Sequence, residues 1–403
     1  MHLPPRTQLV KPFLAMQVLE EGERLRREGI DVIHLSVGEP DFPTPACVVE
    51  AAEAALREGR THYTHSLGDP DLREAIAEHY QSRYLVSVDP GQIVVTSGSS
   101  PALLLALAAI VDRGSEVLVP DPGYPCYPNM ALFLDARVRR FPLEAAEGFT
   151  YQVDRVRERV GRETAAVMIN SPANPTGAVL DREKLRALAD LPAWIIADET
   201  YHDLEYGEPS PTMLEFTDHC FVVNTFSKRY AMTGWRLGWL VAPKQFVAPI
   251  QNMQQNLFIC AAAFAQRAGI AALRQAGPEV ERMRAEYDRR RQYIVPRLCQ
   301  LGLEVPVAPQ GAYYVLADAR RLGRESLALS RRILERARVT VTPGVDFGPG
   351  GEGFLRFSYA TSLEQIEEAL DRIEVAMRRL ASRGEDASED TPKQRSGSRS
   401  GGG

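Results

Sequence analysis

The sequence predicts an α/β protein in which helices sandwich a mostly parallel sheet, followed by a smaller α+β domain. Short apolar runs typical of buried strands recur between residues 32 and 241, and segments of helical periodicity separate several of them. After Ala242 the pattern changes to long helices with only two further short strands. Such alternation is typical of a sheet with helices on both faces, and the change of pattern indicates a second domain.

The elements of the first part follow from their residue patterns. Glu and Arg alternate with apolar residues in a predicted amphipathic helix at 14–27, Pro101 marks the start of a helix at 102–111, and helices are also expected at 47–58 and 72–83. Continuous apolar runs of strand length indicate strands that are buried on both faces. These strands are expected at residues 32–37, 93–96, 116–120, 165–169, 194–197, 220–223 and 237–241.

The second part begins with long helical patterns. We expect helices at 246–273, with an interruption near Gln254, and at 278–301, followed by helices at 326–338 and 363–380 and strands at 313–317 and 354–359. Residues 381–403 are almost entirely Ser, Gly and charged residues. A segment with so few apolar residues cannot offset its ordering entropy, so we expect it to be disordered.

Composition excludes several classes of function. The 403 residues carry 47 basic and 53 acidic side chains, a net charge of −6, with no basic stripe that would indicate nucleic acid or an anionic membrane. The five cysteines form no CxxC pair, so neither a disulfide framework nor a metal site is expected. The N-terminus lacks the apolar run of a signal peptide, and the longest apolar stretch is too short to span a bilayer. We therefore expect small-molecule chemistry in a reducing, cytoplasmic setting.

Lys228 is the first candidate for chemistry. It lies between two predicted buried strands, and ligands gather outside the carboxyl ends of strands in open α/β sheets. Burial and a neighbouring cation, here Arg236, lower the pKa of a lysine and make its amine available as a base or a Schiff-base nucleophile. A solvated surface lysine is the alternative interpretation.

Two loops that follow other strands offer a phosphate site and a flat surface. Gly98, Ser99 and Ser100 precede a helix, whose free N–H groups and dipole could hold a phosphate; an ordinary helix cap is the alternative. Tyr124 lies on a turn stiffened by proline, where its ring could stack on a flat heteroaromatic ligand.

The next two strands end in an amide and an acid. Asn174 lies in a loop whose backbone is tightly fixed by two X-Pro bonds, one of which could be cis, and a glycine. This rigidity could serve to direct the Asn174 amide at a ligand. A simple sharp turn is the alternative interpretation. Asp198 directly follows apolar residues and is either a paired structural carboxylate or an acid directed at the crevice of Lys228.

Together these groups match the needs of pyridoxal 5′-phosphate. Its aldehyde requires a lysine, its ring nitrogen a carboxylate, its phenolic oxygen hydrogen-bond donors, and its phosphate N–H groups and an arginine.

The sequence resembles the class I/II aminotransferases of the aspartate aminotransferase kind, in the fold type I superfamily of pyridoxal-phosphate enzymes. Three motifs carry the resemblance, which runs from about residue 37 to 380: Ser-Pro-Ala-Asn-Pro-Thr-Gly at 171–177, Asp198-Glu199-x-Tyr201, and Ser227-Lys228-x5-Gly234-Trp235-Arg236-x-Gly238. The resemblance implies an N-terminal arm at 1–45 that contributes to the small domain, a large cofactor-binding domain at 46–276 and a small domain at 277–380.

The resemblance also implies roles for individual residues. Lys228 would bond the cofactor aldehyde and then move the proton between the substrate α-carbon and the cofactor, while Asp198 would stabilise the protonated ring nitrogen. Asn174 and Tyr201 would contact the phenolic oxygen, and Tyr124 would stack on the ring. The remaining implied contacts are Gly98, Ser99, Ser100, Thr225, Ser227 and Arg236 around the cofactor phosphate, and Arg356 with the backbone of Gly38, beside Asn174, around the substrate α-carboxylate.

Tyr63 matches a tyrosine that reaches the cofactor phosphate of the neighbouring subunit, so the resemblance implies a homodimer with shared active sites. The expected reaction moves an amino group from an L-amino acid to a 2-oxo acid, with 2-oxoglutarate as the acceptor, by a ping-pong mechanism. Ser100 aligns with a lysine that binds the distal carboxylate in aspartate-specific relatives, which leaves the donor open.

Two alternatives belong to other classes of function. Relatives with the same lysine site catalyse C–S β-elimination, and a lyase would release keto acid without an acceptor. A non-enzymatic ligand-sensing regulator would require an added basic DNA-binding module, which the sequence lacks.

Overall fold

The computed structural model describes residue 4 and residues 6–382. The tail predicted at 381–403 lies outside the described residues from position 383 onward. Within the described part of the chain, no helix combines the length and apolar character needed to cross a membrane.

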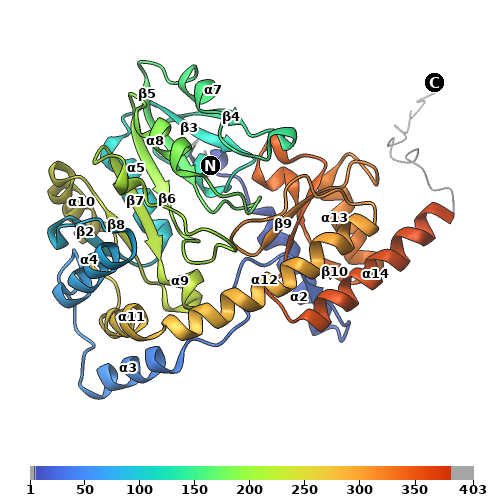
Figure 1. Cartoon of the computed structure of the whole chain (residues 1–403), viewed down its shortest axis with the longest axis horizontal. Helices are drawn as coiled ribbons and strands as arrows, with labels where there is room; N and C mark the ends of the chain where they lie inside the picture. Colours follow the sequence, from blue (N-terminus) through green and yellow to red (C-terminus); the bar gives the residue numbers. More distant parts are fainter. Residues whose placement is uncertain (1–3, 5, 383–403) are drawn as a thin grey trace, which may run out of the picture.

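A seven-stranded sheet forms the centre of the larger unit (Figure 1). Its strand order is β2-β8-β7-β6-β5-β3-β4, with only β8 antiparallel to its neighbours. The carboxyl ends of the parallel strands and the start of β8 therefore share one edge. The strands are β2 (Ile93–Thr96), β3 (Glu116–Asp121), β4 (Arg137–Pro142), β5 (Thr164–Asn170), β6 (Trp194–Asp198), β7 (Cys220–Thr225) and β8 (Gly238–Val241).

Helices bury both faces of this sheet, as its continuous apolar strands require. In β5, Ala166 and Met168 pack into the cluster formed with α5, whereas Val167 and Ile169 pack into the cluster on the opposite face with α4 and α11. The helices of this unit are α3 (Ala46–Arg57), α4 (Pro70–Tyr84), α5 (Ser99–Ile110), α6 (Cys126–Phe133), α7 (Val153–Arg157), α8 (Arg182–Ala189), α9 (Phe226–Arg229), α10 (Lys244–Leu257) and α11 (Ala263–Gln275).

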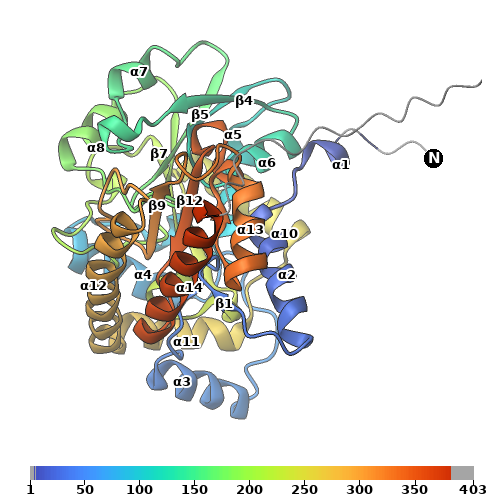
Figure 2. The same ribbon diagram turned by 90° about the vertical axis from the view of Figure 1, so that its right-hand side faces the viewer.

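A smaller unit packs beside the large one, and the long helix α12 (Gly277–Gln300) runs beneath both (Figures 1 and 2). The antiparallel sheet of the smaller unit has the order β11-β12-β9, and in the same unit β1 pairs in parallel with β10. The N-terminal helix α2 packs against β10 and β11. The elements are α1 (Arg6–Leu9), α2 (Leu14–Arg27), β1 (Ile33–His34), β9 (Tyr314–Asp318), α13 (Ser326–Ala337), β10 (Val339–Thr340), β11 (Thr342–Pro343), β12 (Phe354–Ser358) and α14 (Leu363–Ser382).

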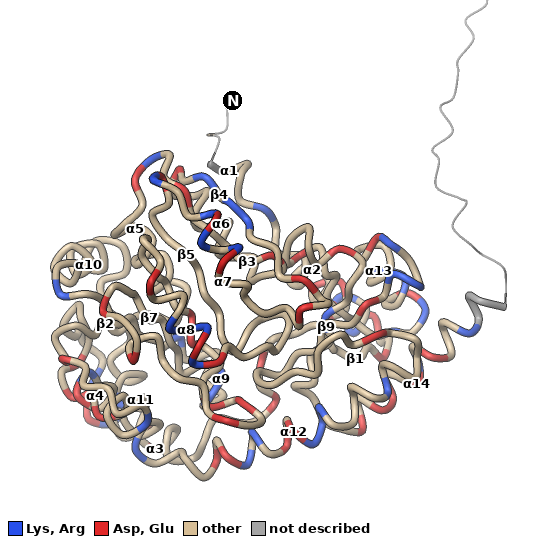
Figure 3. Tube along the Cα trace, turned by 45° about the horizontal axis from the view of Figure 1, so that its top comes forward, with Lys and Arg blue, Asp and Glu red and all other residues tan. Residues whose placement is uncertain are grey.

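Charged side chains lie mainly on the outer helices. Figure 3 shows both signs interspersed along α12 and α14, and many of them pair one turn apart, such as Arg284 with Glu281 and Arg289 with Glu286. Exposed pairs of this kind contribute only about 0.3–0.5 kcal/mol each, so the stability of these helices rests on their buried faces.

The structure differs from the predicted elements at several places. Strand β4 was not predicted, because its sequence Arg-Val-Arg-Arg-Phe-Pro is that of an edge strand with one exposed face. The strand expected at 32–37 covers only two residues, since its partner β10 is equally short. The helix expected at 246–273 is broken at 258–262, close to the predicted interruption.

Candidate active site

A cavity of about 530 Å³ lies at the carboxyl edge of the large sheet, between the two units. Loops after β3, β5, β6 and β7 form its base, while α2 and β12 close it from the small unit. Its lining residues are Phe13, Ala15, Met16, Leu19, Ser36, Val37, Gly38, Glu39, Ser99, Ser100, Tyr124, Asn170, Asn174, Asp198, Thr200, Tyr201, Ser227, Lys228, Thr233, Arg236, Tyr314 and Arg356.

Lys228 extends into this cavity from the short helix α9, which follows β7 directly. Thr225 caps the helix by accepting a hydrogen bond from the Ser227 N–H at 3.2 Å. The Lys228 Nζ donates to the carbonyl of Gly38 at 2.6 Å. Burial lowers the pKa of Lys228 to about 8, although the charge of Glu39 acts in the opposite direction. The amine is therefore far easier to deprotonate than a surface lysine.

Asp198 ends β6 and is 5% exposed. Its carboxylate accepts a hydrogen bond from the Tyr127 hydroxyl at 2.7 Å and one from the Thr200 N–H at 3.1 Å. Burial raises the pKa of Asp198, and these two donors together with the Lys228 charge oppose the rise. The site thus supplies a carboxylate held rigidly on one wall of the cavity, with donors that favour its charged form.

Arg356 enters the cavity from β12 and is 2% exposed. Its two terminal nitrogens donate to the side-chain oxygen of Asn174 at 2.8 Å and to the carbonyl of Ser36 at 2.6 Å. The guanidinium lies over the ring of Tyr314 at 4.3 Å. Its Nε has no hydrogen-bond partner. A guanidinium that lines the cavity is suited to binding a carboxylate from a ligand.

The start of α5 forms a cradle with unused N–H groups. Its N-cap residue Gly98 has φ +96° and provides no side-chain hydrogen bond to the first turn. A Cβ on Gly98 would lie 2.5 Å from Nη2 of Arg236, so only glycine lets this arginine approach the helix start. Arg236 is fixed by a 2.9 Å bond to the Thr233 carbonyl. Helix N–H groups and an arginine at one point make a natural phosphate site.

Most residues predicted for the site line this one cavity. Gly98 and Thr225 lie directly behind it, and Thr225 Oγ1 lies 2.9 Å from the Leu237 carbonyl. Tyr63 is 84% exposed and lies outside the cavity within this single chain. The predicted residues that line it are Gly38, Ser99, Ser100, Tyr124, Asn174, Asp198, Tyr201, Ser227, Lys228, Arg236 and Arg356.

Several residues that shape the site were not predicted. Tyr127 donates to Asp198, the side-chain oxygen of Asn170 accepts from the Asn174 N–H at 2.8 Å, and the Tyr314 hydroxyl lies 2.8 Å from that of Tyr201. The second aromatic of Tyr-Pro-Cys-Tyr at 124–127 was a local signal for Tyr127. Tyr314 had none, because Tyr201 lies 113 residues away in the sequence.

The loop at 171–177 has cis peptide bonds at Ser171–Pro172 and Asn174–Pro175, which fits the tight backbone expected from its sequence.

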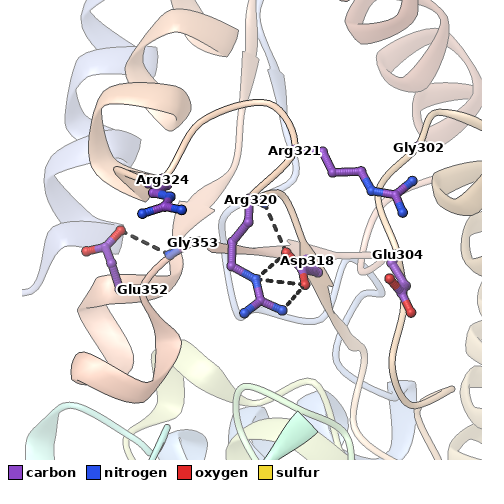
Figure 4. Close-up of a pocket in the computed structure, with 8 residues that line it drawn as sticks. All are labelled: Gly302, Glu304, Asp318, Arg320, Arg321, Arg324, Glu352 and Gly353. Atoms are coloured by element: carbon purple, nitrogen blue, oxygen red, sulfur yellow. Dashed lines mark hydrogen bonds and ion pairs between the residues drawn. The ribbon is translucent and has the colours of Figure 1, made fainter. Parts of the chain in front are cut away.

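Another hollow, of about 600 Å³, lies on the small unit (Figure 4). Its charged residues include Arg320, which forms a hydrogen-bonded ion pair with Asp318, and the exposed Arg321 and Arg324. None of the residues predicted for catalysis line it. The hollow on the small unit is therefore not a candidate for the chemistry predicted from the sequence.

The donor set of that cavity fits pyridoxal phosphate. An amine of lowered pKa, a rigid carboxylate and a phosphate cradle face one space, with the ring of Tyr124 on its wall. By contrast, the described residues contain no cluster of three or more His, Cys, Asp or Glu side chains placed to hold a metal ion.

Comparisons with known proteins agree with this geometry. The family model of aminotransferase class I and II matches residues 30–373. An aspartate aminotransferase of Pyrococcus horikoshii is 38% identical over 381 residues, covering 92% of this chain and 96% of that protein. A valine–pyruvate aminotransferase of Mycobacterium tuberculosis is 38% identical over 376 residues, covering 90% and 96%. The structure of Thermus thermophilus aspartate aminotransferase with maleate aligns with a TM-score of 0.90 at 37% identity, covering 93% of this chain and all of that one.

These matches confirm the predicted fold class and favour a transaminase over the β-lyase and the regulator, because the relatives are aminotransferases along nearly their whole length. The chain belongs to the aminotransferase class I and II family and is an aspartate aminotransferase-like transaminase that uses pyridoxal phosphate.

Proposed function

We propose that transamination takes place in the cavity of Lys228, with Lys228 as the residue that bonds the cofactor and moves the proton. The observation that carries the proposal is the convergence of Lys228, Asp198 and Arg356 from three strands on one cavity. An amine, an acid and a carboxylate binder are the three groups that transfer of an amino group from an amino acid requires.

When bound, pyridoxal phosphate supplies an aldehyde that accepts the amino group and a ring that withdraws electrons from the substrate α-carbon. Asp198 would keep the ring nitrogen protonated, and its hydrogen bonds from Tyr127 and Thr200 would hold the carboxylate in place. Lys228 Nζ would take a proton from the substrate α-carbon and deliver it to the carbon that carried the cofactor aldehyde. The lowered pKa suits this role, because the amine must be neutral to accept the proton.

Arg356, which lines the cavity, would bind the α-carboxylate through its guanidinium. Asn174 would orient Arg356 through its 2.8 Å bond and contact the phenolic oxygen together with Tyr201. The phosphate would lie against Ser99, Ser100, Ser227 and Arg236, with Gly98 giving Arg236 its access and Thr225 holding the turn that carries Lys228.

For the acceptor we propose 2-oxoglutarate first, by analogy with the family, and pyruvate second. Two observations favour pyruvate. Among the described residues, the Lys and Arg side chains that line the cavity are Lys228, Arg236 and Arg356. All three have proposed roles, so none of them remains for a second carboxylate. One relative is a valine–pyruvate aminotransferase.

We also propose a homodimer with shared active sites. Several large apolar or aromatic side chains are exposed, among them Tyr63 by 84%, Leu257 by 61% and Ile259 by 47%. A partner subunit would cover these exposed side chains, and Tyr63 of this chain would reach the phosphate site of the partner subunit. We also propose domain boundaries at residues 45, 276 and 380.

We further propose a cytoplasmic location, which the five free cysteines favour.

The test is a panel of L-amino acid donors assayed with 2-oxoglutarate, pyruvate or no acceptor. We expect keto acid to form only with an acceptor and expect Lys228→Ala to lose both turnover and the visible absorbance of lysine-bound cofactor. A variant that kept both would exclude Lys228 from its role. Pyruvate and ammonia released without an acceptor would indicate a lyase instead.

A further inference from the structure

The N-terminal segment from Lys11 to Leu19, here named the strap, lies along one wall of the active-site cavity. It comprises Lys11, Pro12, the N-cap Phe13 and the first turns of α2. Phe13, Ala15, Met16 and Leu19 of this strap line the cavity. All four are apolar, in contrast to the polar base that holds Lys228 and Asp198.

The large unit holds one end of the strap. The Lys11 N–H donates to the side-chain oxygen of Asn129 at 3.1 Å, and the Asn129 amide donates back to the Lys11 carbonyl at 3.3 Å. Asn129 belongs to α6, the helix that directly follows Tyr124 and also carries Tyr127. This reciprocal pair therefore ties the strap to the same segment that forms the aromatic wall of the cavity.

The small unit holds the other end through Asp346. One carboxylate oxygen accepts from the Leu14 N–H at 2.9 Å, and the other accepts from the Ala15 N–H at 3.0 Å. The chain's own N-cap residue, Phe13, makes no side-chain capping bond. Asp346 thus replaces a local cap from more than three hundred residues away, and it satisfies two N–H groups that α2 would otherwise leave unpaired.

Phe13 lies between the two anchors and meets the ring of Tyr124 edge to face, with 6.2 Å between centroids. A substrate bound through Arg356 and the cofactor would direct its side chain to the part of the cavity that the strap covers. Glu39, also on the cavity wall, places a negative charge there. An apolar wall in a cavity that also holds a carboxylate disfavours a second acidic group on the donor. Because the acceptor occupies the same cavity in turn, this wall also favours the second acceptor candidate, pyruvate, over the dicarboxylate 2-oxoglutarate.

We propose that the strap forms the side-chain subsite of this transaminase, that it selects L-amino acids with uncharged apolar side chains, and that Asn129 and Asp346 are the residues that position it. The inference rests on the proposed function of the cavity and adds the class of donor and two positioning residues. Neither residue lines the cavity, so both act through the strap.

The first experiment measures selectivity in the enzyme loaded with pyridoxal phosphate. Alanine, leucine, phenylalanine and aspartate are compared as donors by kcat/KM in the unsubstituted protein, in Phe13→Ala, and in the anchor variants Asn129→Ala and Asp346→Asn. We expect leucine and phenylalanine to exceed aspartate. We expect the ratio of phenylalanine to alanine to fall about tenfold in each variant, chiefly through KM, which is the usual effect of a lost apolar contact in a binding pocket.

Matched controls separate positioning from general damage. Asp181 caps α8 through the Lys184 N–H at 2.8 Å, as Asp346 caps α2, but it does not line the cavity or contact the strap. Gln292 forms an exposed side-chain hydrogen bond within α12. Asp181→Asn and Gln292→Ala should leave the donor ratio unchanged.

Hydrogen exchange gives a readout independent of turnover. Asp346→Ala and Asn129→Ala should raise amide exchange in residues 11–19, including Leu14 and Ala15, and leave α8 unaffected. Because Asp346→Asn keeps one acceptor oxygen, its exchange should be intermediate.

The outcomes distinguish this inference from the proposed function. No turnover of any donor by the unsubstituted protein would refute the proposed function. Turnover with aspartate as the best donor would overturn the donor class. A donor ratio that stayed constant in all strap and anchor variants would overturn the role of the strap.

Discussion

Replacing Tyr127 by Phe should weaken the carboxylate form of Asp198 without changing the shape of the site. The Tyr127 hydroxyl is buried and donates to a buried carboxylate at 2.7 Å. A hydrogen bond to a charged group in such surroundings contributes about 1.5–3 kcal/mol, and 1.36 kcal/mol corresponds to one pKa unit. Tyr127→Phe should therefore raise the pKa of Asp198 further, by roughly one to two units.

The consequence for activity follows from the sign of this shift. Asp198 must be charged to stabilise the protonated ring nitrogen, so the acid limb of kcat/KM should move to higher pH by about the same one to two units. Burial already raises the pKa of Asp198 above that of an ordinary carboxyl group. The folded protein therefore loses stability as the pH rises from the ordinary carboxyl pKa through the raised pKa of Asp198. The variant should increase this cost and lower the free energy of unfolding at neutral pH by about 1.5–3 kcal/mol, with little change at pH values where the acid is protonated.

The assay is a pH profile of transamination together with urea unfolding of the cofactor-free protein. Tyr80→Phe is the matched control, because the Tyr80 hydroxyl is equally buried but accepts from the Trp239 indole at 3.1 Å, away from the cavity. The control should leave the acid limb in place. An acid limb that did not move in Tyr127→Phe would refute the reasoning.

Three further predictions concern other groups. Capture of pyridoxal phosphate by the cofactor-free protein should rise with pH through about 8, the pKa of Lys228. With that pKa, roughly a tenth of the Lys228 amines are neutral at pH 7. A pH profile of capture with its midpoint near the pKa of an ordinary lysine would contradict this prediction. Gly98→Ala should lower cofactor affinity at least about tenfold in an absorbance titration, since its Cβ would meet Arg236 at 2.5 Å and its φ is +96°; unchanged affinity would exclude the cradle. Glu199, whose pKa burial raises to about 8, contributes stability that is fully present below the ordinary carboxyl pKa and is lost as pH rises through about 8. In denaturant unfolding, the free energy of unfolding of the unsubstituted protein should therefore fall relative to that of Glu199→Gln by up to ~1.4 kcal/mol per pH unit over that window. If the free energies of unfolding of the two proteins changed with pH in parallel, Glu199 would ionise without a stability cost.

Much of the fold was predictable because buried strands leave a strong local signal. The apolar runs of β5, β6 and β7 are continuous, and residues predicted for the site, such as Asp198 and Lys228, lie at or shortly after the ends of these strands. Edge strand β4 lacked that signal because its arginines alternate with apolar residues. Local pattern predicts an element well where both of its faces are buried.

The candidate site was predictable for residues in the motifs and in other segments at strand ends, but the contacts that join these segments were not. The motif residues of the large domain are close in sequence to the strand ends that position them. The contacts that fix the substrate side of the cavity join distant segments: Asn174 with Arg356, Tyr201 with Tyr314, and Leu14 with Asp346. No periodicity or spacing connects such pairs, because only the tertiary packing of the folded chain brings them together.

The adjacent acids Asp198 and Glu199 show why the surroundings decide chemistry. Both are buried after β6, but successive residues point to opposite sides. Asp198 faces the cavity, with Tyr127 and Thr200 as donors and the charge of Lys228 nearby, all of which favour its anion. Glu199 faces away, where it accepts from Thr212 and the Met213 N–H while its Oε2 has no hydrogen-bond partner. Its pKa of about 8 keeps it neutral at pH 7. Asp198 would thus serve the cofactor, whereas Glu199 holds the loop that follows β6. The sequence Asp-Glu alone does not reveal this difference.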